Sequence, residues 1–341
     1  MLTRWHCISL AILAVCAYHS SIRMATAPQT RTQWRAALAA LPTLEETKGR
    51  IPSFFYAHGH PGLLWPAGLP SMMDWGIGGP GGPLSTFLQD FGKELLSKYR
   101  PKAVLVFSAH WETSSPQVTD YDDNPLLYDY YGFDRKLYDI KFNSKGDPRV
   151  ARRVVEILQE SGYSKARLSG ITESRGRDGR PRPPRVQNGL DHGVFLPSVL
   201  MFGETSPVPI VQASIADTLE PEDEWRLGQA VSKLRDEGIL VIAGGLTIHT
   251  FQDFDAFNPA KADAIYHEWH KAIINSIADS RTPEERKAAL LALTKHRAFR
   301  KAHPREDHFV PLYVAAGAGQ EGNARVLAGL FGAETIAFGL P

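Results

Sequence analysis

Short runs of consecutive apolar residues mark segments that are typical of buried strands. These runs are rich in β-branched and aromatic residues, and they lie at residues 53–57, 103–108, 208–215 and 239–243. A run that is apolar at every position, rather than at alternate positions, is typical of a strand covered on both faces of a sheet. The pattern therefore predicts four buried strands.

Amphipathic stretches separate and follow these runs. Apolar residues recur there at helical spacing, at residues 85–99, 148–161, 223–237, 262–279 and in a charged stretch at 283–303. Strands that alternate with helices indicate an α/β fold with a largely parallel central sheet and helices on both faces. Because no linker divides the chain, we expect one domain at residues 50–335, preceded by an N-terminal extension at residues 1–45.

The composition is that of a globular protein with a large core. The chain has 341 residues, of which 43% are hydrophobic and 22% are charged, and its formal net charge is +1. This balance gives no bias toward nucleic acids or membranes as partners. It leaves the oligomeric state open.

Both cysteines, Cys7 and Cys16, lie near the N-terminus. The rest of the chain therefore has no thiol for a disulfide or a zinc–thiolate site, and any metal must bind His, Asp or Glu. The apolar run at residues 8–18 follows Arg4 and has the length of a signal-peptide core. It fits a cleaved signal, a mitochondrial presequence or sequence upstream of a true start at Met24, and we expect a cytoplasmic protein.

Two segments are irregular. Residues 175–185, with the sequence RGRDGRPRPPR, are too polar and too rich in Pro and Gly to pack, which predicts an exposed loop. Residues 76–83, with the sequence GIGGPGGP, lack the Lys-Ser/Thr of a P-loop and no strand leads straight into them. We interpret this second segment as, at most, a flexible active-site loop.

Three histidines follow predicted strands. His58 comes after the first strand, His110 after the second and His249 after the fourth. In open α/β sheets, ligands bind in the crevice beyond the carboxyl ends of the strands. We therefore expect these three side chains to converge on one site, although they lie far apart in the sequence.

Two further histidines precede apolar helices. His308 lies just before Pro311, which suits the first turn of a helix continuing to Gly317. The positive end of a helix dipole disfavours imidazolium and keeps a ring nitrogen available for a metal, and Asp307 could orient a ligand ring. His192 is placed similarly, after Asp191 and before an apolar stretch, and is a second candidate for site chemistry.

The remaining histidines are weaker candidates, since a single histidine is more often a hydrogen-bonded core residue than a ligand. His60 should point away from His58 if the segment stays extended. The other four lie on charged stretches and are predicted to be solvated; they are His267, His270, His296 and His303.

Several ordered motifs lie on these segments. They are HGHP at 58–61, SAHW at 108–111, YDYYGFDRKLYDIKF at 128–142, GLDHGVFLP at 189–197, GGLTIH ending at His249, and HPREDHFVPL at 303–312. Together they resemble the class III extradiol ring-cleaving dioxygenases, which have the LigB-type fold, and in particular their DOPA 4,5-dioxygenase-like branch. The resemblance covers residues 52–319.

The resemblance implies a role for each matching residue. His58, His110 and His308 would bind one divalent metal ion, with His249 beside them as a further ligand or an acid/base. His192 would contact the substrate or relay a proton. The tetrad common in this branch is HGSP, so His60 in HGHP would alter the rim of the pocket.

Ring cleavage by this family implies a small aromatic diol and O2 as substrates. Imidazole ligands suit Fe(II) and Zn(II) alike, but only iron has an accessible redox couple, so we expect Fe(II) for activity with Zn(II) as an alternative. His192 or His249 would act as the general base. Tyr131, in an aromatic cluster with Tyr128, Tyr130 and Phe133, would wall the substrate ring.

Two other functions fit the same residues. A metal-dependent hydrolase would use the same histidines to activate water. A non-enzymatic binding protein on the same fold is the third hypothesis, although such a protein would be free to lose ligands and none is missing here.

Overall fold

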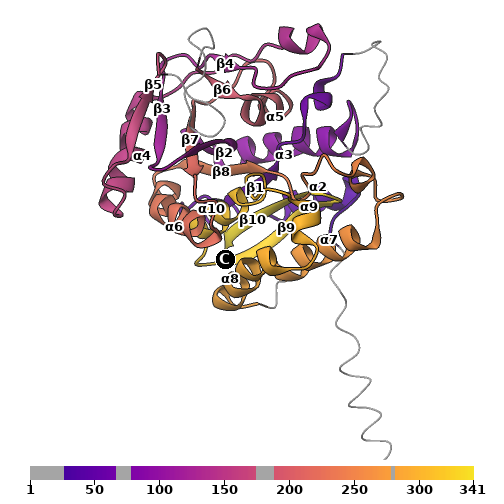
Figure 1. Ribbon diagram of the computed structural model, residues 1–341. Coiled ribbons are helices and arrows are strands. Elements are labelled where there is room, and N and C mark those ends of the chain that lie inside the picture. The colour runs from indigo at the N-terminus through magenta and orange to yellow at the C-terminus, as the bar shows by residue number, and fades with distance from the viewer. Residues whose placement is uncertain (1–26, 67–77, 174–187, 278–280) are drawn as a thin grey trace, which may run out of the picture.

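A mixed eight-stranded sheet forms the centre of the molecule (Figure 1). The structure is a computed structural model that describes residues 27–66, 78–173, 188–277 and 281–341. The strands, in their order across the sheet, are β5 (Arg167–Gly170), β3 (Gln117–Asp120), β7 (Ile210–Ala216), β2 (Ala103–Thr113), β8 (Ile239–Gly245), β1 (Ser53–Ala57), β10 (Ala333–Leu340) and β9 (Asn323–Leu330). A separate parallel pair joins β4 (Leu126–Leu127) to β6 (Leu190–Asp191).

The four predicted strands form the parallel centre of this sheet. β7, β2, β8 and β1 pair in parallel, so their carboxyl ends meet at one edge. Toward both sides the sheet becomes antiparallel, where β3 pairs with β7 and β10 pairs with β1 and β9. The prediction of an α/β fold with a largely parallel sheet is confirmed: the central strands are parallel, and so are β3 and β5 at one edge.

Helices cover both faces of the sheet, as predicted. Figure 1 shows α3 (Pro83–Tyr99) and α5 (His192–Phe202) on one side and α6 (Pro221–Val231) and α10 (Pro311–Ala318) on the other. The remaining helices are α2 (Arg31–Ala39), α4 (Pro148–Glu160), α7 (Ala264–Ser276), α8 (Pro283–Leu291) and α9 (Phe299–Ala302).

The continuous apolar runs serve two separate cores. In β1, Phe54 and Tyr56 point into the core beneath α3 and α5, whereas Phe55 points into the core beneath α6 and α10. Alternate side chains of β2 and β8 divide in the same way. Because both faces are covered, every position of these strands must be apolar or internally hydrogen-bonded.

Some elements differ from the prediction. The stretch at 283–303 is not one helix but α8, the 3-10 turn Ala292–Lys295 and α9, because the chain changes direction to pack Phe299 against Trp269. Helix α6 begins at Pro221 and ends at Val231, and a 3-10 turn, Ser232–Arg235, follows it. The β9–β10 hairpin was not predicted; it turns at Gly332, whose φ of 76° suits glycine.

The described part of the predicted N-terminal extension is packed against the domain. Trp34 on α2 is buried edge-on against Phe87 of α3 and donates a hydrogen bond from its indole nitrogen to Asp90. The predictions about Cys7, Cys16 and the apolar run at 8–18 lie outside the described residues, as does the loop at 175–185. Among the described helices, none is long and apolar enough to cross a membrane.

A bulge in β2 brings His110 to the edge of the sheet. Ser108 pairs with Ser214 of β7, but the next paired residue of β2 is Glu112, so residues 109–111 have no partner on β7. Strand β2 therefore does not end at residue 108 but continues through His110 to Thr113. Bulges of this kind re-aim side chains and are common beside active sites.

A buried ion pair joins β10 to α7. The Glu334 side chain is fully buried and accepts hydrogen bonds from His270 Nδ1 at 2.5 Å and from the Thr247 hydroxyl. Burial lowers the pKa of His270, but the charge and hydrogen bond of Glu334 outweigh burial, so the pKa is raised above its ordinary value. The protonated imidazole therefore stabilises the folded state.

We expect the contribution of His270 to stability to depend on pH. A folded-state pKa above the unfolded one gives stability that is fully present below the unfolded pKa, about 6.5, and is lost as pH rises through the folded pKa. His270→Gln keeps a donor for Glu334 but removes the charge, so it should destabilise the protein more at low pH than at high pH. Urea unfolding of the wild type and of His270→Gln, once at mildly acidic pH and once at alkaline pH, measures this difference. Equal destabilisation at the two pH values would contradict the prediction.

Candidate metal centre

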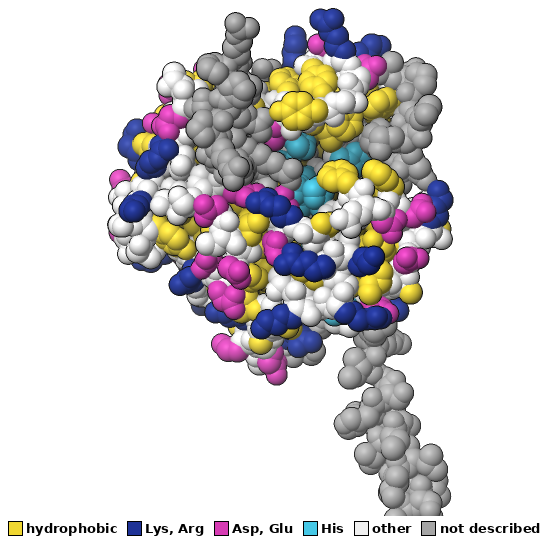
Figure 2. All heavy atoms as spheres, viewed as in Figure 1, with side chains coloured by type: hydrophobic (Ala, Val, Ile, Leu, Met, Phe, Trp, Pro, Cys, Tyr) yellow, Lys and Arg dark blue, Asp and Glu magenta, His cyan; other side chains and the backbone are white. Residues whose placement is uncertain are grey.

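Three buried histidines meet at the carboxyl edge of the central strands. His58 follows β1, His110 lies in the bulge of β2, and His308 lies in the turn before α10. Their ligand atoms all lie within 4.8 Å of one another. Figure 2 shows histidine side chains at the bottom of a hollow in the surface.

The end of β8 fixes two of these residues through the backbone. The amide of His58 donates to the Gly245 carbonyl at 3.0 Å, and the amide of Leu246 donates to the His308 carbonyl at 2.8 Å. The segments that hold His58 and His308 are therefore tied to the same point of the sheet. Main-chain bonds of this kind fix the positions of the rings without using the side chains.

Each of the three rings has an acceptor near its Nδ1 atom. The Nδ1 of His58 lies 2.8 Å from the Gly59 carbonyl, and that of His110 lies 3.2 Å from an Asp191 oxygen. The Nδ1 of His308 lies 3.2 Å from Asp307. For His58 and His110 these acceptors favour the tautomer with the proton on Nδ1, which leaves Nε2 with a free lone pair. The contact between His308 and Asp307 lacks hydrogen-bond geometry and acts through charge.

The three Nε2 atoms are suited to a cation. The Nε2 atoms of His110 and His308 are 3.0 Å apart, and the Nε2 of His58 is buried without a hydrogen-bond partner among the described residues. Lone pairs this close repel one another unless a positive charge lies between them. Nitrogen ligands held at about 2.1 Å from one metal ion and at right angles would have about this separation.

Burial keeps the rings of His58 and His308 in the neutral form that binds metals. Burial, and then the charges of His110 and His192, hold the pKa of His58 well below its ordinary value. Burial and the charge of His249 likewise lower the pKa of His308. A metal ion does not have to displace a proton from such rings.

Asp191 is the main support of His110. Asp191 is fully buried, and besides His110 it accepts hydrogen bonds from the Ser108 hydroxyl at 2.9 Å and from the Gln212 amide. Gly193 is required nearby, because a Cβ at this position would lie 2.7 Å from His110 Nδ1. In the sequence, Asp191 stands out only as a neighbour of His192, and its support of the His110 ring was not predicted.

His192 and Asp129 form a dyad beside the three histidines. The Nδ1 of His192 lies 2.7 Å from an Asp129 oxygen, which also accepts the backbone amide of His192 at 3.0 Å. Burial raises the pKa of Asp129, but the charge and hydrogen bonds of His192 outweigh it and lower the pKa overall. The His192 ring stacks on that of His110, with centroids 4.1 Å apart.

Asp129 was missed in the sequence analysis, although it lies in the quoted YDYYG segment. Neighbouring Tyr130 contacts the His192 ring, at 5.4 Å between centroids, and the role of Tyr131 at the substrate ring stays a prediction. Tyr130 is buried, whereas 76% of the Tyr131 surface is exposed. A tyrosine run in a loop has no periodicity that tells which ring points inward.

His249 lies on the other side of the centre. Its ring stacks on that of His308 with centroids 3.5 Å apart, and it groups with Asp307 and His308 rather than with His58 and His110. The structure therefore brings His249 beside the three converging nitrogens, in a position from which it can reach a molecule bound there.

His60 lies close to this site, at the start of a 3-10 turn. Its Nδ1 accepts the Gly62 amide at 3.0 Å, and burial followed by the charge of His192 lowers its pKa to about 4. Gly78, in the described part of the glycine-rich segment, packs against the His60 ring, since a Cβ there would lie 2.6 Å from Nε2. Residues 76 and 77 of that segment lie outside the described residues.

The prediction that four other histidines are solvated is wrong. His303 is fully buried and its Nε2 lies 2.9 Å from the Thr247 carbonyl, while His267, His270 and His296 are half-buried. His303 packs against Phe299 and Phe309. The charged residues around it in the sequence point outward and conceal this packing.

An ion-pair network links the segments that carry His110 and His308. Arg305 binds buried Glu112 through its two terminal guanidinium nitrogens, Nη1 and Nη2. Its Nη1 also lies 3.2 Å from Asp307. The pKa of Arg305 is raised, first by its hydrogen bond to Glu112. This network ties β2 to the turn before α10 and supports Asp307 against His308.

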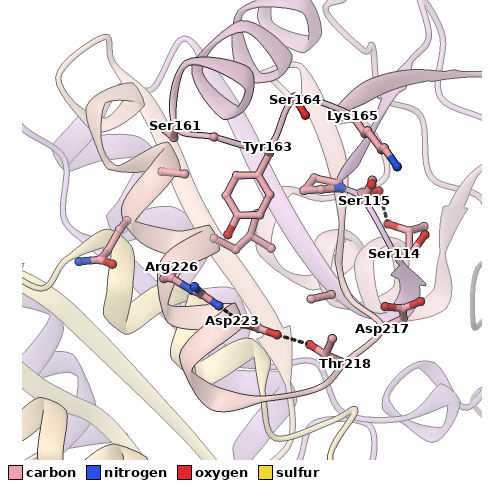
Figure 3. Close-up of a pocket in the computed structure, with 17 residues that line it drawn as sticks. Ser114, Ser115, Ser161, Tyr163, Ser164, Lys165, Asp217, Thr218, Asp223 and Arg226 are labelled. Atoms are coloured by element: carbon pink, nitrogen blue, oxygen red, sulfur yellow. Dashed lines mark hydrogen bonds and ion pairs between the residues drawn. The ribbon is translucent and has the colours of Figure 1, made fainter.

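One described cavity lies away from these histidines. It has a volume of about 780 Å³, and the residues that line it include no histidine. Figure 3 shows that Asp223 there pairs with Arg226 and accepts a hydrogen bond from Thr218, at 2.7 Å. The candidate reactive site is identified by the convergence of ring nitrogens and not by the presence of a cavity.

Comparisons with known proteins agree on one family. Residues 76–337 match the model of the catalytic LigB subunit of aromatic ring-opening dioxygenase. A 4,5-DOPA dioxygenase extradiol-like protein of Schizosaccharomyces pombe is 40% identical over 309 residues, which are 90% of this chain and 97% of the relative. A 4,5-DOPA dioxygenase extradiol of Beta vulgaris is 31% identical over 79% of this chain and 87% of its own.

A solved structure supports the fold. An uncharacterised protein of Escherichia coli K12 superimposes with a TM-score of 0.58 over 85% of this chain and all of its own, at 21% sequence identity. Identity this low indicates a shared fold and carries no information on the reaction.

Metal analysis tests the centre directly. We expect His110→Ala to lose bound divalent metal, because it removes one of three converging nitrogens. Asp191→Asn should bind metal about 10–100-fold more weakly, since it removes the acceptor that orients His110. His296→Gln, which changes a half-buried histidine on another element, is the matched control and should keep the metal. Unchanged metal affinity in both site variants would argue against the centre.

Proposed function

The chain belongs to the LigB family of class III extradiol dioxygenases, and we propose that it opens the ring of a catechol with O2 at one divalent metal ion. The observation that carries the proposal is the convergence of three buried Nε2 atoms beneath a surface hollow. His58, His110 and His308 would hold the ion. A site with three protein ligands leaves positions open for substrate.

The proposed ion is Fe(II). When bound, a redox-active ion gives the catechol oxygens and O2 adjacent positions and lets electrons pass between them, which Zn(II) cannot do. The three imidazoles accept either ion, so the ligand set does not decide between them. The requirement of the reaction for electron transfer favours iron.

The His192–Asp129 dyad would move the substrate proton. Asp129 accepts from His192 Nδ1, which leaves Nε2 as the basic atom. His192 stacks on His110, so this atom lies beside the centre and is placed to take a proton from a catechol hydroxyl. His249, stacked on His308, would act as a second acid/base on the opposite side.

The first substrate to test is DOPA, because relatives named for it match this chain. In the overall reaction, both atoms of O2 enter the product and one ring carbon–carbon bond beside the diol breaks. The product is a muconic semialdehyde. The diol carbon of the broken bond becomes a carboxylate, and the neighbouring ring carbon of that bond, which carries no hydroxyl, becomes an aldehyde. No external reductant is needed.

Oxygen uptake with a yellow product tests this reaction. Protein reconstituted anaerobically with Fe(II) should consume one O2 per catechol and form the semialdehyde chromophore, whereas Zn(II)-loaded protein should not. A panel that includes DOPA and simple catechols covers the substrate class. Absence of uptake and colour across the panel, in protein shown to hold iron, would refute the proposal.

Two substitutions test the proton-transfer role. His192→Gln should lower kcat about 10²–10⁴-fold, the usual worth of a general acid/base, without loss of metal. Asp129→Asn should lower kcat less and change its pH profile, because it disturbs the tautomer of His192 while leaving the imidazole. Metal content serves as the control, and an unchanged kcat in His192→Gln would show that another group moves the proton.

A further inference from the structure

Exposed aromatic side chains lie in two segments on opposite sides of the histidines. In one segment, Phe251 and Phe254 are 71% and 63% exposed; in the other, Tyr131 is 76% exposed. Figure 2 shows hydrophobic side chains above and below the hollow that contains the histidines. Large apolar side chains left this exposed mark binding surfaces more often than chance, because burying them is favourable.

Phe251 lies beside the candidate metal centre, in contact with the ring of His249. It meets the His249 ring edge-on, with centroids 5.0 Å apart and planes at 80°. His249 in turn stacks on the proposed ligand His308. Phe251 therefore lies two ring contacts from the proposed ligand His308.

The backbone of this segment holds both rings outward. The Thr250 hydroxyl accepts the Gln252 amide at 3.2 Å, and the Asp253 carboxylate accepts the Asp255 amide at 3.0 Å. Asp253 thereby caps the 3-10 turn Phe254–Phe257, whose first residue is Phe254. The exposure of the two rings thus belongs to an ordered turn with its own hydrogen bonds.

The charges near these rings disfavour a carboxylate on the substrate. Residues 249–257 contain Asp253 and Asp255 and no Lys or Arg. The cation nearest to the centre along the His308 segment, Arg305, is engaged by Glu112 and Asp307. A substituent ending in a carboxylate would meet like charge at this wall.

We propose that Phe251 and Phe254 form a specificity wall that contacts the ring substituent of the catechol and favours an apolar, uncharged substituent over an amino-acid side chain. The proposal rests on the proposed function and names its substrate more closely. An apolar substituent would gain aromatic contact and cover both rings. The zwitterionic side chain of DOPA would lose hydration of two charged groups at these rings and would bring its carboxylate toward the aspartates.

Binding to Zn(II)-loaded protein tests the wall without turnover. The probes are catechol, 4-ethylcatechol, dopamine and DOPA, titrated by calorimetry against the wild type, Phe251→Ala and Phe251→Leu. The wild type should bind 4-ethylcatechol about tenfold more tightly than DOPA, and Phe251→Ala should remove most of this preference while leaving catechol binding unchanged. Phe251→Leu should keep part of it, because leucine preserves apolar contact without the ring.

The outcomes distinguish a failure of the specificity wall from a failure of the proposed reaction. Tighter binding of DOPA than of 4-ethylcatechol would overturn the proposal, because recognition of the amino-acid group would then decide specificity. Dopamine has the ammonium of DOPA but no carboxylate, so it should bind more tightly than DOPA; weaker binding of dopamine would contradict the role of the aspartates. Equal losses for catechol and 4-ethylcatechol in Phe251→Ala would also overturn it. If the binding preference is found but Fe(II)-loaded protein cleaves none of the four, the proposed reaction fails and the wall stands. Phe254→Ala should repeat the effect of Phe251→Ala.

Discussion

Three buried imidazoles whose ligand nitrogens lie within 4.8 Å of one another are the constraint on which the rest of this structure depends. Such an arrangement is unfavourable without a cation and must be imposed by its surroundings. Main-chain bonds from the end of β8 fix the segments of His58 and His308, and the buried Asp191 carboxylate fixes the ring of His110. The sheet, the bulge of β2 and the ion pair of Arg305 with Glu112 all act to hold this convergence.

The acids and bases of the site are placed around that centre in layers. His192 and His249 each stack on one of the converging rings, so both lie at its edge rather than in it. Asp129 lies behind His192 and favours the proton on its Nδ1. One fold thus provides imidazoles for two tasks, and position distinguishes them: the proposed ligands converge, and the proposed acid/base rings stack on them.

Much of this could be predicted from the sequence, and the failures have physical causes. Strands buried on both faces are apolar at every position, so the parallel centre and the histidines after its strands were predicted. The β9–β10 hairpin was not, because β9 is partly exposed and β10 contains the buried polar residues Glu334 and Thr335, which interrupt its apolar run. Asp129 and Asp191 act through hydrogen bonds with residues far away in the sequence, and such contacts leave no periodic pattern. His303 was misread because its buried ring lies among outward-facing charges.

The wide separation of the proposed ligands in the sequence determines the order in which the chain folds and binds metal. His110 and His308 lie 198 positions apart, and their nitrogens meet only when the whole sheet has formed. A nascent or partly folded chain therefore presents no site, and metal capture must follow folding instead of guiding it. Folded protein can then act as a reservoir of empty sites, whose occupancy follows the supply of metal in its surroundings and adds to stability by mass action.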